Sequence, residues 1–390
     1  MIMRTLIPVL EQLAGQYPVV TVTGPRQSGK TTICRNTFPN KPYVNLESPD
    51  TREFAHSDPR GFLSSYPDGA ILDEIQRVPQ LLSYLQPIID EHNVPGQFIL
   101  TGSQQFEVMT TIGQSLAGRT ALLKLLPLSI EELAGAGVKP SIDALLLNGF
   151  YPRIYDAGLN PTQALGDYFE TYVERDIRQL INIKDLALFE KFVRLCAGRT
   201  GQLLNLQSLG NDVGVSHTTA RSWLTLLEAS YVILLLQPWH TNISKRQVKT
   251  PKLYFYDVGL ASYLLGVENE LHVNRHPLRG NLFENLVVIE ALKYRYNRGK
   301  RSNLHFWRDA KGNEVDLVIE SGPDIVPVEI KSGATISNDF FKGLRTFSEK
   351  LPSPSGNCAL VYGGSEKQQR SDASVWCVGD VAEMMEKVSR

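Results

Sequence analysis

Gly24-Pro25-Arg26-Gln27-Ser28-Gly29-Lys30-Thr31 lies between an apolar run, residues 19–22, and a segment that starts at Thr32 and can open a helix. Glycines at this spacing let successive backbone N–H groups turn toward a chain of phosphates. In such a loop the lysine reaches the β- and γ-phosphates and the threonine hydroxyl binds Mg²⁺. A glycine-rich turn with an incidental lysine would not need a strand before it and a helix after it. We therefore expect residues 24–32 to bind ATP with Mg²⁺.

Two further apolar runs end in polar side chains. Residues 70–72 are followed by Asp73 and Glu74, and residues 98–100 are followed by Thr101 and Ser103. We expect Asp73 to hold the metal and Glu74 to act as the general base for the water that attacks the γ-phosphate. Ligands of open parallel sheets bind at the carboxyl ends of the strands. Either Thr101 or Ser103 could therefore orient that water.

The phosphate loop, the Asp73-Glu74 pair and the strand that ends Leu100-Thr101-Gly102-Ser103 together resemble an AAA+ ATPase, an α/β fold. The resemblance implies an arginine finger just before the fifth strand, and Arg119 stands directly before the strand-like residues 121–125. It further implies that Arg119 acts on the γ-phosphate of a neighbouring subunit in a homo-oligomer. The alternative is an ordinary surface arginine.

Length and composition are those of a protein with several domains. The chain has 390 residues, 42% of them hydrophobic, and a formal net charge of −1, so any DNA-binding surface must be local. No apolar run approaches the length of a membrane span, and no secretory segment follows the first residues. The four cysteines are scattered, which argues against a zinc site. We expect a cytoplasmic protein without membrane contact.

The middle of the chain has the pattern of a helix-turn-helix. A short helix over residues 208–213, a turn over residues 214–216 and a second helix over residues 217–228 are predicted, with Ser216 as the N-cap. The second helix is expected to bury a stripe at helical spacing, made of Ala220, Trp223, Leu224 and Leu227. Its opposite face is able to contact DNA, and the expected wing follows with a basic segment over residues 245–252 that ends at Lys252. Its use as a protein contact within an oligomer is the alternative. The candidate DNA-binding residues are His217, Thr218, Arg221, Lys245 and Arg246.

The last third of the chain carries a second group of acids. Glu284 is expected on an amphipathic helix, Asp316 on one strand, and Glu329 and Lys331 on a second strand joined to the first by a hairpin through residues 321–324. Alternation places Glu329 and Lys331 on one face of their strand. Carboxylates gather a hard divalent cation, and an adjacent ammonium can steady an attacking water. Seven Lys and Arg residues against one acid between positions 293 and 311 favour a phosphodiester partner.

These four residues resemble the PD-(D/E)xK nucleases, although Val315 rather than proline precedes the motif aspartate. The resemblance implies that Glu284, Asp316 and Glu329 hold Mg²⁺ or Mn²⁺ and that Lys331 is catalytic. Over almost its entire length the chain is similar to prokaryotic proteins that join an AAA-type domain to a C-terminal domain of uncharacterised function. The expected parts are an ATPase domain over residues 1–135, a helical lid over 136–200, a winged helix-turn-helix over 201–270 and a restriction-endonuclease-like α/β domain over 271–390. Near the end of the ATPase domain, Ser129 and Glu132 have the spacing of a capping box that starts a helix.

The leading hypothesis is an ATP-dependent DNA-processing enzyme, an ATPase coupled to a metal-dependent nuclease. The alternative is a nucleotide-gated DNA-binding regulator or switch ATPase whose nuclease-like domain is an inactive scaffold. An ATPase acting on a protein partner is a third possibility, and no aromatic pore-loop motif follows the second expected strand.

Overall fold

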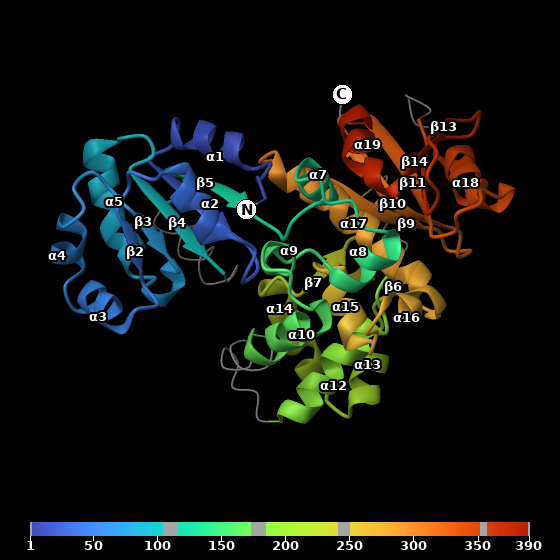
Figure 1. The fold of residues 1–390 in the computed structure, drawn as a ribbon, viewed down its shortest axis with the longest axis horizontal. Helices are drawn as coiled ribbons and strands as arrows, with labels where there is room; N and C mark the ends of the chain where they lie inside the picture. The colour runs from blue at the N-terminus through green and yellow to red at the C-terminus, as the bar shows by residue number, and fades with distance from the viewer. Residues whose placement is uncertain (1, 104–115, 173–184, 241–249, 352–356, 389–390) are drawn as a thin grey trace. The chain divides into compact units, whose positions relative to one another are not determined.

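The computed structural model describes residues 2–103, 116–172, 185–240, 250–351 and 357–388 (Figure 1). The chain divides into two compact units. The first contains Met1–Leu128 with two short later segments, Ala229–Tyr231 and Arg295–Lys300. The second contains the rest of the chain, so residues that we had assigned to three separate domains pack together in one unit. None of the described helices has both the length and the apolarity that a membrane span requires.

The first unit is built on a parallel sheet whose strands lie in the order β2-β3-β4-β1-β5. The strands are β1 (Val19–Thr23), β2 (Tyr43–Asn45), β3 (Ile71–Asp73), β4 (Phe98–Gly102) and β5 (Thr120–Lys124). The helices are α1 (Ile7–Ala14), α2 (Lys30–Thr37), α3 (Pro49–Ser57), α4 (Pro59–Ser64) and α5 (Leu81–His92). Because all five strands run the same way, the polar residues that follow β1, β3 and β4 meet at one edge of the sheet.

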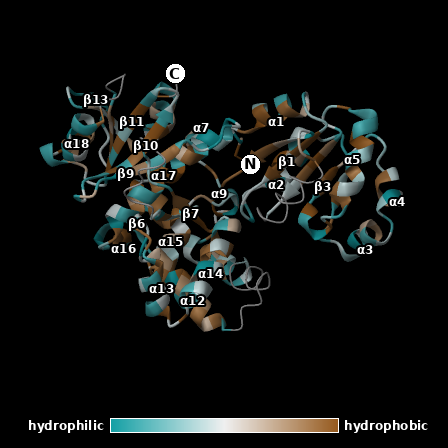
Figure 2. Cartoon of the chain, turned by 180° about the vertical axis from the view of Figure 1, so that it is seen from behind, coloured by the Kyte–Doolittle hydropathy of each residue, from teal (hydrophilic) through white to brown (hydrophobic). Residues whose placement is uncertain are grey.

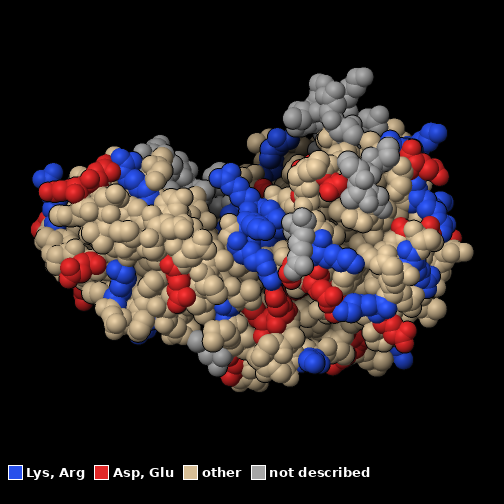
Figure 3. Space-filling model, turned by 90° about the horizontal axis from the view of Figure 1, so that it is seen from above, with Lys and Arg blue, Asp and Glu red and all other residues tan. Residues whose placement is uncertain are grey.

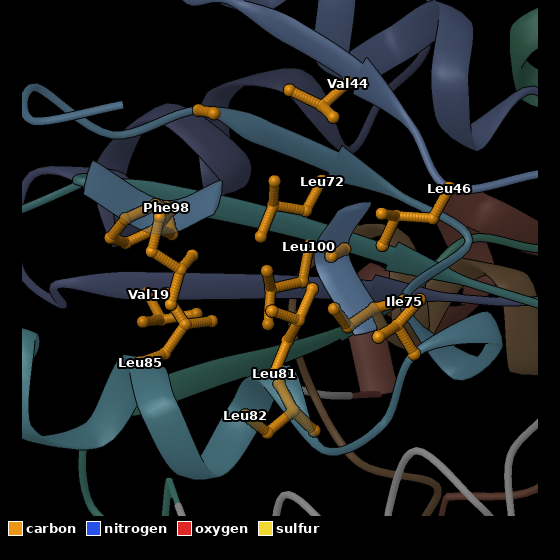
Figure 4. Close-up of a cluster of buried hydrophobic side chains, with 14 of the residues drawn as sticks. Val19, Val44, Leu46, Leu72, Ile75, Leu81, Leu82, Leu85, Phe98 and Leu100 are labelled. Atoms are coloured by element: carbon orange, nitrogen blue, oxygen red, sulfur yellow. The ribbon is translucent and has the colours of Figure 1, made fainter. Parts of the chain in front are cut away.

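Apolar side chains cover both faces of the central strands, which explains why β1, β3 and β4 are largely apolar and buried throughout. On one face Leu72, Phe98 and Leu100 pack against Leu81 and Leu85 of α5 (Figure 4). In Figure 2 the strands β1 and β3 are brown, whereas the outer helices α3 and α4 carry much teal. The sheet is therefore a buried platform that holds the strand ends in place.

The second unit begins with helices and a small antiparallel sheet. The helices are α7 (Ile130–Gly135), α8 (Ile142–Asn148), α9 (Pro152–Asp156), α10 (Pro161–Tyr168), α12 (Leu186–Ala197), α13 (Leu206–Val213), α14 (His217–Ala229), α15 (Val258–Leu264) and α16 (Glu270–Arg275). The strands β6 (Gln202–Leu203), β7 (Ile233–Leu236) and β8 (Lys252–Phe255) pair in the order β6-β8-β7.

A mixed six-stranded sheet completes the second unit, in the order β13-β14-β12-β11-β10-β9. Its elements are α17 (Arg279–Asn297), β9 (Leu304–Arg308), β10 (Glu314–Ser321), β11 (Asp324–Lys331), α18 (Lys342–Lys350), β12 (Ala359–Tyr362), β13 (Gln368–Gln369), β14 (Ser374–Cys377) and α19 (Val381–Val388). The predicted hairpin is confirmed, since β10 and β11 pair antiparallel up to Ser321 and Asp324.

The local helix predictions are confirmed with one exception. Ser129 and Glu132 form the expected capping box of α7, and the Ser216 hydroxyl accepts the Thr219 N–H at 3.1 Å at the start of α14. Helix α17 is not amphipathic, because it is buried on nearly all sides. Asn285 of α17 bonds to the backbone of Phe255 in β8 through both its oxygen and its nitrogen. Polar residues on this helix therefore mark internal contacts and not a solvent face.

Candidate functional site

The phosphate loop adopts a backbone that its glycines make possible. Gly24 has φ +152° and Gly29 has φ +92°, and a side chain at Gly24 would bring its Cβ to 2.0 Å from the carbonyl oxygen of Leu125. The buried Arg4 supports the loop from behind, since its guanidinium donates to the carbonyl oxygens of Ser28 at 2.7 Å and Leu126 at 2.6 Å. Sequence reasoning missed Arg4, which lies twenty residues before the loop.

Lys30 is buried beneath this loop. Its Nζ donates to the carbonyl oxygens of Gly24 at 3.1 Å and Pro25 at 2.8 Å. Burial lowers the pKa of Lys30, while the nearby carboxylates of Glu74 and Asp73 oppose that shift. An ammonium held in a desolvated loop is a strong partner for phosphate oxygens, because the low local dielectric strengthens the attraction.

Asp73 is the centre of a polar group at the edge of the sheet. Thr31 donates its hydroxyl to both carboxylate oxygens of Asp73 at 3.0 Å, and Tyr43 donates to Oδ2 at 2.8 Å. The Thr101 hydroxyl also donates to Asp73. Burial, followed by the hydrogen bond to Asp73, raises the pKa of the Tyr43 phenol. Thr31 at the end of the loop, Tyr43 of β2 and Thr101 of β4 thus each bring one hydroxyl to the Asp73 carboxylate of β3. Tyr43 was not predicted.

Glu74 makes a second set of contacts beside the first. It has φ +58°, an uncommon conformation for a non-glycine residue, and its backbone N–H donates to the Thr101 hydroxyl at 3.2 Å. The Ser103 hydroxyl donates to Glu74 Oε2 at 3.0 Å. Gln76, another residue that we did not predict, donates to Glu74 and, at 3.0 Å, to Ser103. Of the two candidate hydroxyls, Thr101 therefore contacts Asp73, and Ser103 contacts the carboxylate of Glu74.

The residues around the loop suit a nucleotide with a hard divalent cation. The Thr31 hydroxyl and the Asp73 carboxylate are oxygen ligands of the kind that Mg²⁺ prefers. The Ser28 hydroxyl is buried and has no hydrogen-bond partner among the described residues. Gln27 and Thr32 are exposed at the loop surface. The Arg26 side chain forms an ion pair with Glu47 at 2.6 Å.

Arg119 lies away from its own phosphate loop. It comes directly before β5, and β5 runs parallel to β1 with Thr120 opposite Val19, whereas the loop follows the other end of β1. Its guanidinium forms a two-pronged contact with Asp90 of α5, at 2.5 and 2.8 Å. Arg119 therefore does not lie at the phosphate loop of its own chain.

The predicted face of the helix-turn-helix is exposed. His217, Thr218 and Arg221 of α14 are exposed. The opposite side of α14 is buried as predicted, and its members are Ala220, Trp223, Leu224 and Leu227. Lys245 and Arg246 lie outside the described residues.

The C-terminal residues that we singled out come together. Lys331 Nζ lies 3.1 Å from Asp316 Oδ2 and 2.6 Å from Glu329 Oε2, and the backbone N–H of Ile330 donates to Asp316 at 2.9 Å. Asp316 therefore joins β10 to β11 through both a backbone and a side-chain contact.

A second lysine, which the sequence pattern places in the basic wing, reaches the same acids. Lys252 of β8 is buried, with Nζ 2.8 Å from Glu284, 2.5 Å from Glu314 and 4.0 Å from Asp316. Tyr254, two residues along the same strand, donates its hydroxyl to Glu284 at 2.6 Å. We call Glu284, Glu314, Asp316 and Glu329, with Lys252 and Lys331, the acid cluster. Sequence reasoning did not place Lys252, Tyr254 or Glu314 at this site. The one available signal was Lys252 itself, a lysine inside an apolar strand.

Burial and mutual repulsion shift the pKa values of these acids. Burial, followed by the charge of Asp316, raises the pKa of Glu284 to about 7 and that of Glu329 to about 9. Burial acts on Asp316 in the same direction, but Lys331 and Lys252 together hold the pKa of Asp316 below its ordinary value. The two ammonium groups therefore stabilise Asp316 as a carboxylate.

Other basic residues of this region are also paired. Lys293, expected in a basic surface, is buried and lies 2.7 Å from Glu290. Arg308 pairs with Glu314 at 2.7 Å. Part of the positive charge between positions 293 and 311 therefore balances internal acids instead of facing a phosphodiester.

Relatives over nearly the full length show where the chain belongs. It is 31% identical over 369 residues to Uncharacterized protein Rv2008c of Mycobacterium tuberculosis and, equally, to Uncharacterized protein Mb2031c of Mycobacterium bovis, with 94% of this chain and 81% of each relative covered. This chain belongs to the family of those two proteins. Three family models match parts of it: an AAA domain over residues 16–134, domain of unknown function DUF8612 over 139–271 and domain of unknown function DUF4143 over 279–381.

The AAA match covers the phosphate loop and all five strands of the first unit. The first unit is an AAA-type P-loop ATPase domain. Among solved structures, a Walker-type ATPase of Pyrococcus abyssi is 15% identical with a TM-score of 0.44, covering 66% of this chain and 94% of that one. AMPPCP-bound DnaA from Aquifex aeolicus is 16% identical with a TM-score of 0.29, covering 57% and 85%. Neither likeness identifies a substrate.

The acid cluster does not fit the metal site that we expected. Among the described residues, no group of three or more His, Cys, Asp or Glu side chains is arranged to hold a metal ion. Glu284 and Asp316 each bond to a lysine ammonium, and Glu329 contacts Lys331. The prediction that Glu284, Asp316 and Glu329 bind Mg²⁺ or Mn²⁺ did not include Lys252, and the described residues give it no support.

Proposed function

We propose that this protein is an ATP-driven DNA-processing protein that works as a homo-oligomer. The observation that supports it most is the arrangement at the strand ends of the ATPase domain, where Thr31 and Thr101 bond to Asp73 and Ser103 bonds to Glu74. In this arrangement the Thr31 hydroxyl and the Asp73 carboxylate are the oxygen groups suited to bind a metal. The Glu74 carboxylate is separate from them and is suited to accept a proton from water. Hydrolysis would then change how the second unit binds DNA.

In this proposal each of the candidate site residues of the ATPase domain has one role. Lys30 and the backbone N–H groups of the loop bind the β- and γ-phosphates. Thr31 and Asp73 would hold Mg²⁺, which when bound neutralises charge on those phosphates. Glu74 takes a proton from the attacking water, and Ser103 orients the Glu74 carboxylate. Arg119, from a neighbouring copy, stabilises the charge that develops on the γ-phosphate.

The face of the ATPase domain that is seen in Figure 3 does not favour DNA binding. In Figure 3 the ATPase domain is at the left, and its Lys and Arg side chains are interspersed with Asp and Glu among much uncharged surface. The exposed face of α14 is a better candidate, because it carries Arg221 next to His217 and Thr218 at the start of a helix that follows a tight turn. We propose that this face contacts DNA.

Replacing Arg221 by alanine tests this face. We expect DNA affinity to fall about tenfold and the slope of log affinity against log salt to fall by about 1, because one charge-assisted phosphate contact is lost. Fluorescence anisotropy with linear, forked and four-way DNA at several salt concentrations measures both, and ATP turnover in the same samples shows whether DNA stimulates it. Arg275→Ala on α16, another exposed arginine, is the matched control. Equal loss in both variants, or turnover indifferent to every DNA, would contradict the proposal.

Two hypotheses concern the C-terminal domain. Cleavage of DNA at the acid cluster is favoured by the contact of Lys331 with both Asp316 and Glu329. A nuclease-like scaffold without cleavage is favoured by the buried Lys252, which occupies the middle of the acids. We propose the scaffold, so that the protein is a nucleotide-gated ATPase acting on DNA without cutting it.

The scaffold hypothesis predicts that purified protein leaves duplex, single-stranded and branched DNA intact with either Mg²⁺ or Mn²⁺. It also predicts that Asp316→Ala leaves ATP turnover within about twofold of the wild type, because Asp316 belongs to the other unit. Gel analysis of end-labelled DNA is the measurement. Metal-dependent cleavage that Asp316→Ala and Lys331→Ala both remove would show that the cluster is a nuclease centre.

A further inference from the structure

Lys252 is a buried cation with several acid partners. Its side chain is 2% exposed, and its Nζ contacts Glu284 at 2.8 Å and Glu314 at 2.5 Å, with Asp316 at 4.0 Å. Burying an ammonium is costly unless it is paired and hydrogen-bonded. Three carboxylates from α17 and β10 supply those partners, so this position in the cluster suits a positive charge.

The remaining contacts of the acids leave little space for a reacting group. A Cβ at Gly343 of α18 would lie 1.8 Å from Glu329 Oε1, and a Cβ at Gly201 would lie 3.3 Å from Glu284 Oε2. The side chains of Glu284, Asp316 and Glu329 are 12%, 12% and 5% exposed. A catalytic metal site keeps an open position for water or substrate. These carboxylates instead face protein on several sides.

The charges of the cluster are nearly balanced without a metal. Its four carboxylates meet Lys252 and Lys331, and Arg308 adds a third cation at 2.7 Å from Glu314. A divalent cation placed among the same acids would be repelled by two ammonium groups and, together with Lys252, Lys331 and Arg308, would set five positive charges against at most four negative ones. Mg²⁺ or Mn²⁺ could enter only if Lys252 left.

We propose that Lys252 is the resident cation of the acid cluster, in the place that a divalent metal would take, and that it ties the three-stranded sheet to the six-stranded sheet. The contacts run from β8 through Lys252 and Tyr254 to Glu284 of α17, and through Lys252 to Glu314 of β10. The cluster is in this view a structural joint between two sheets of the second unit. Lys252 is a positioning residue, since it acts by holding the acids.

Metal binding tests this proposal directly. Full-length protein without nucleotide is titrated with Mn²⁺, and bound metal is measured by electron paramagnetic resonance. We expect no Mn²⁺ at the cluster in the wild type, and one Mn²⁺ per chain in Lys252→Met that disappears in the double variant Lys252→Met/Asp316→Asn. Lys342→Met on α18, an exposed lysine, is the control and should gain no metal. Wild-type binding that Asp316→Asn removes, or a folded Lys252→Met that binds none, would overturn the proposal.

Thermal unfolding gives a second test that does not need the single variant to fold well. We expect Lys252→Met to lower Tm by about 10 °C, because it leaves several buried carboxylates without their cation. Adding Glu314→Gln should restore part of that loss, since one unpaired charge is removed. If the two substitutions add without any recovery, Lys252 is not the counter-ion of these acids. Both tests omit ATP and DNA, so their failure leaves the proposed DNA-acting ATPase unaffected.

Discussion

ATP turnover is expected to fall about 10²- to 10³-fold when Lys30 is replaced by alanine, the range typical of removing one preorganised charge-stabilising group. Lys30 is buried, and its Nζ already lies within the loop, bonded to the carbonyl oxygens of Gly24 and Pro25. Its charge is therefore fixed where phosphate oxygens would bind, in surroundings that screen it poorly. Turnover is measured by phosphate release, and binding by titration with a fluorescent ATP analogue.

Lys41→Ala is the matched control for this experiment. Lys41 is a partly buried lysine of the same unit, and its Nζ likewise donates to a backbone carbonyl oxygen, that of Gln97 at 3.1 Å. It lies before β2, at the edge of the sheet opposite the phosphate loop. We expect turnover and nucleotide affinity to stay near wild type in this variant. A Lys30→Ala protein that binds and hydrolyses ATP normally would show that the loop is not the nucleotide site.

Glu74→Gln is expected to separate binding from chemistry. Turnover should fall about 10²- to 10⁴-fold, because an amide cannot accept the proton of the attacking water. Nucleotide affinity should stay within a few-fold of wild type, since the glutamine side chain has nearly the same size and its carbonyl oxygen can still accept the Ser103 hydroxyl that lies 3.0 Å from Glu74. The same two assays measure both quantities.

The control for the second experiment is Glu47→Gln. Glu47 is an exposed acid close to the loop that pairs with Arg26 and, at 3.5 Å, with Arg77. Loss of an exposed ion pair costs little, so we expect only a small change in turnover. If Glu47→Gln lowers turnover as much as Glu74→Gln, or if Glu74→Gln abolishes binding as well, the assignment of Glu74 as general base is wrong.

Sequence reasoning succeeded where a function depends on residues close together in the chain. The loop, the capping box of α7 and the buried stripe of α14 follow from local spacing, and the structure confirms the fold of each. It was less successful with charged residues. Lys252 and Lys293 were both assigned to basic surfaces, yet both are buried beside acids. A lysine has the same local signature whether its partner is water or a carboxylate distant in the sequence.

The sequence alone determined the strand, the glycine-rich loop and the helix that are typical of a phosphate-binding site, because such a site is made by neighbouring backbone groups. It also indicated the hairpin that brings Asp316 near Glu329, because a separation of thirteen positions is enough for two short strands and a turn at residues 321–324. Only the tertiary structure decided that Thr101 and Ser103 contact different acids, and that Lys252 reaches Glu284 across 32 positions. Those contacts depend on how strands and helices pack, and packing brings together residues whose distance in sequence carries no information about their distance in space.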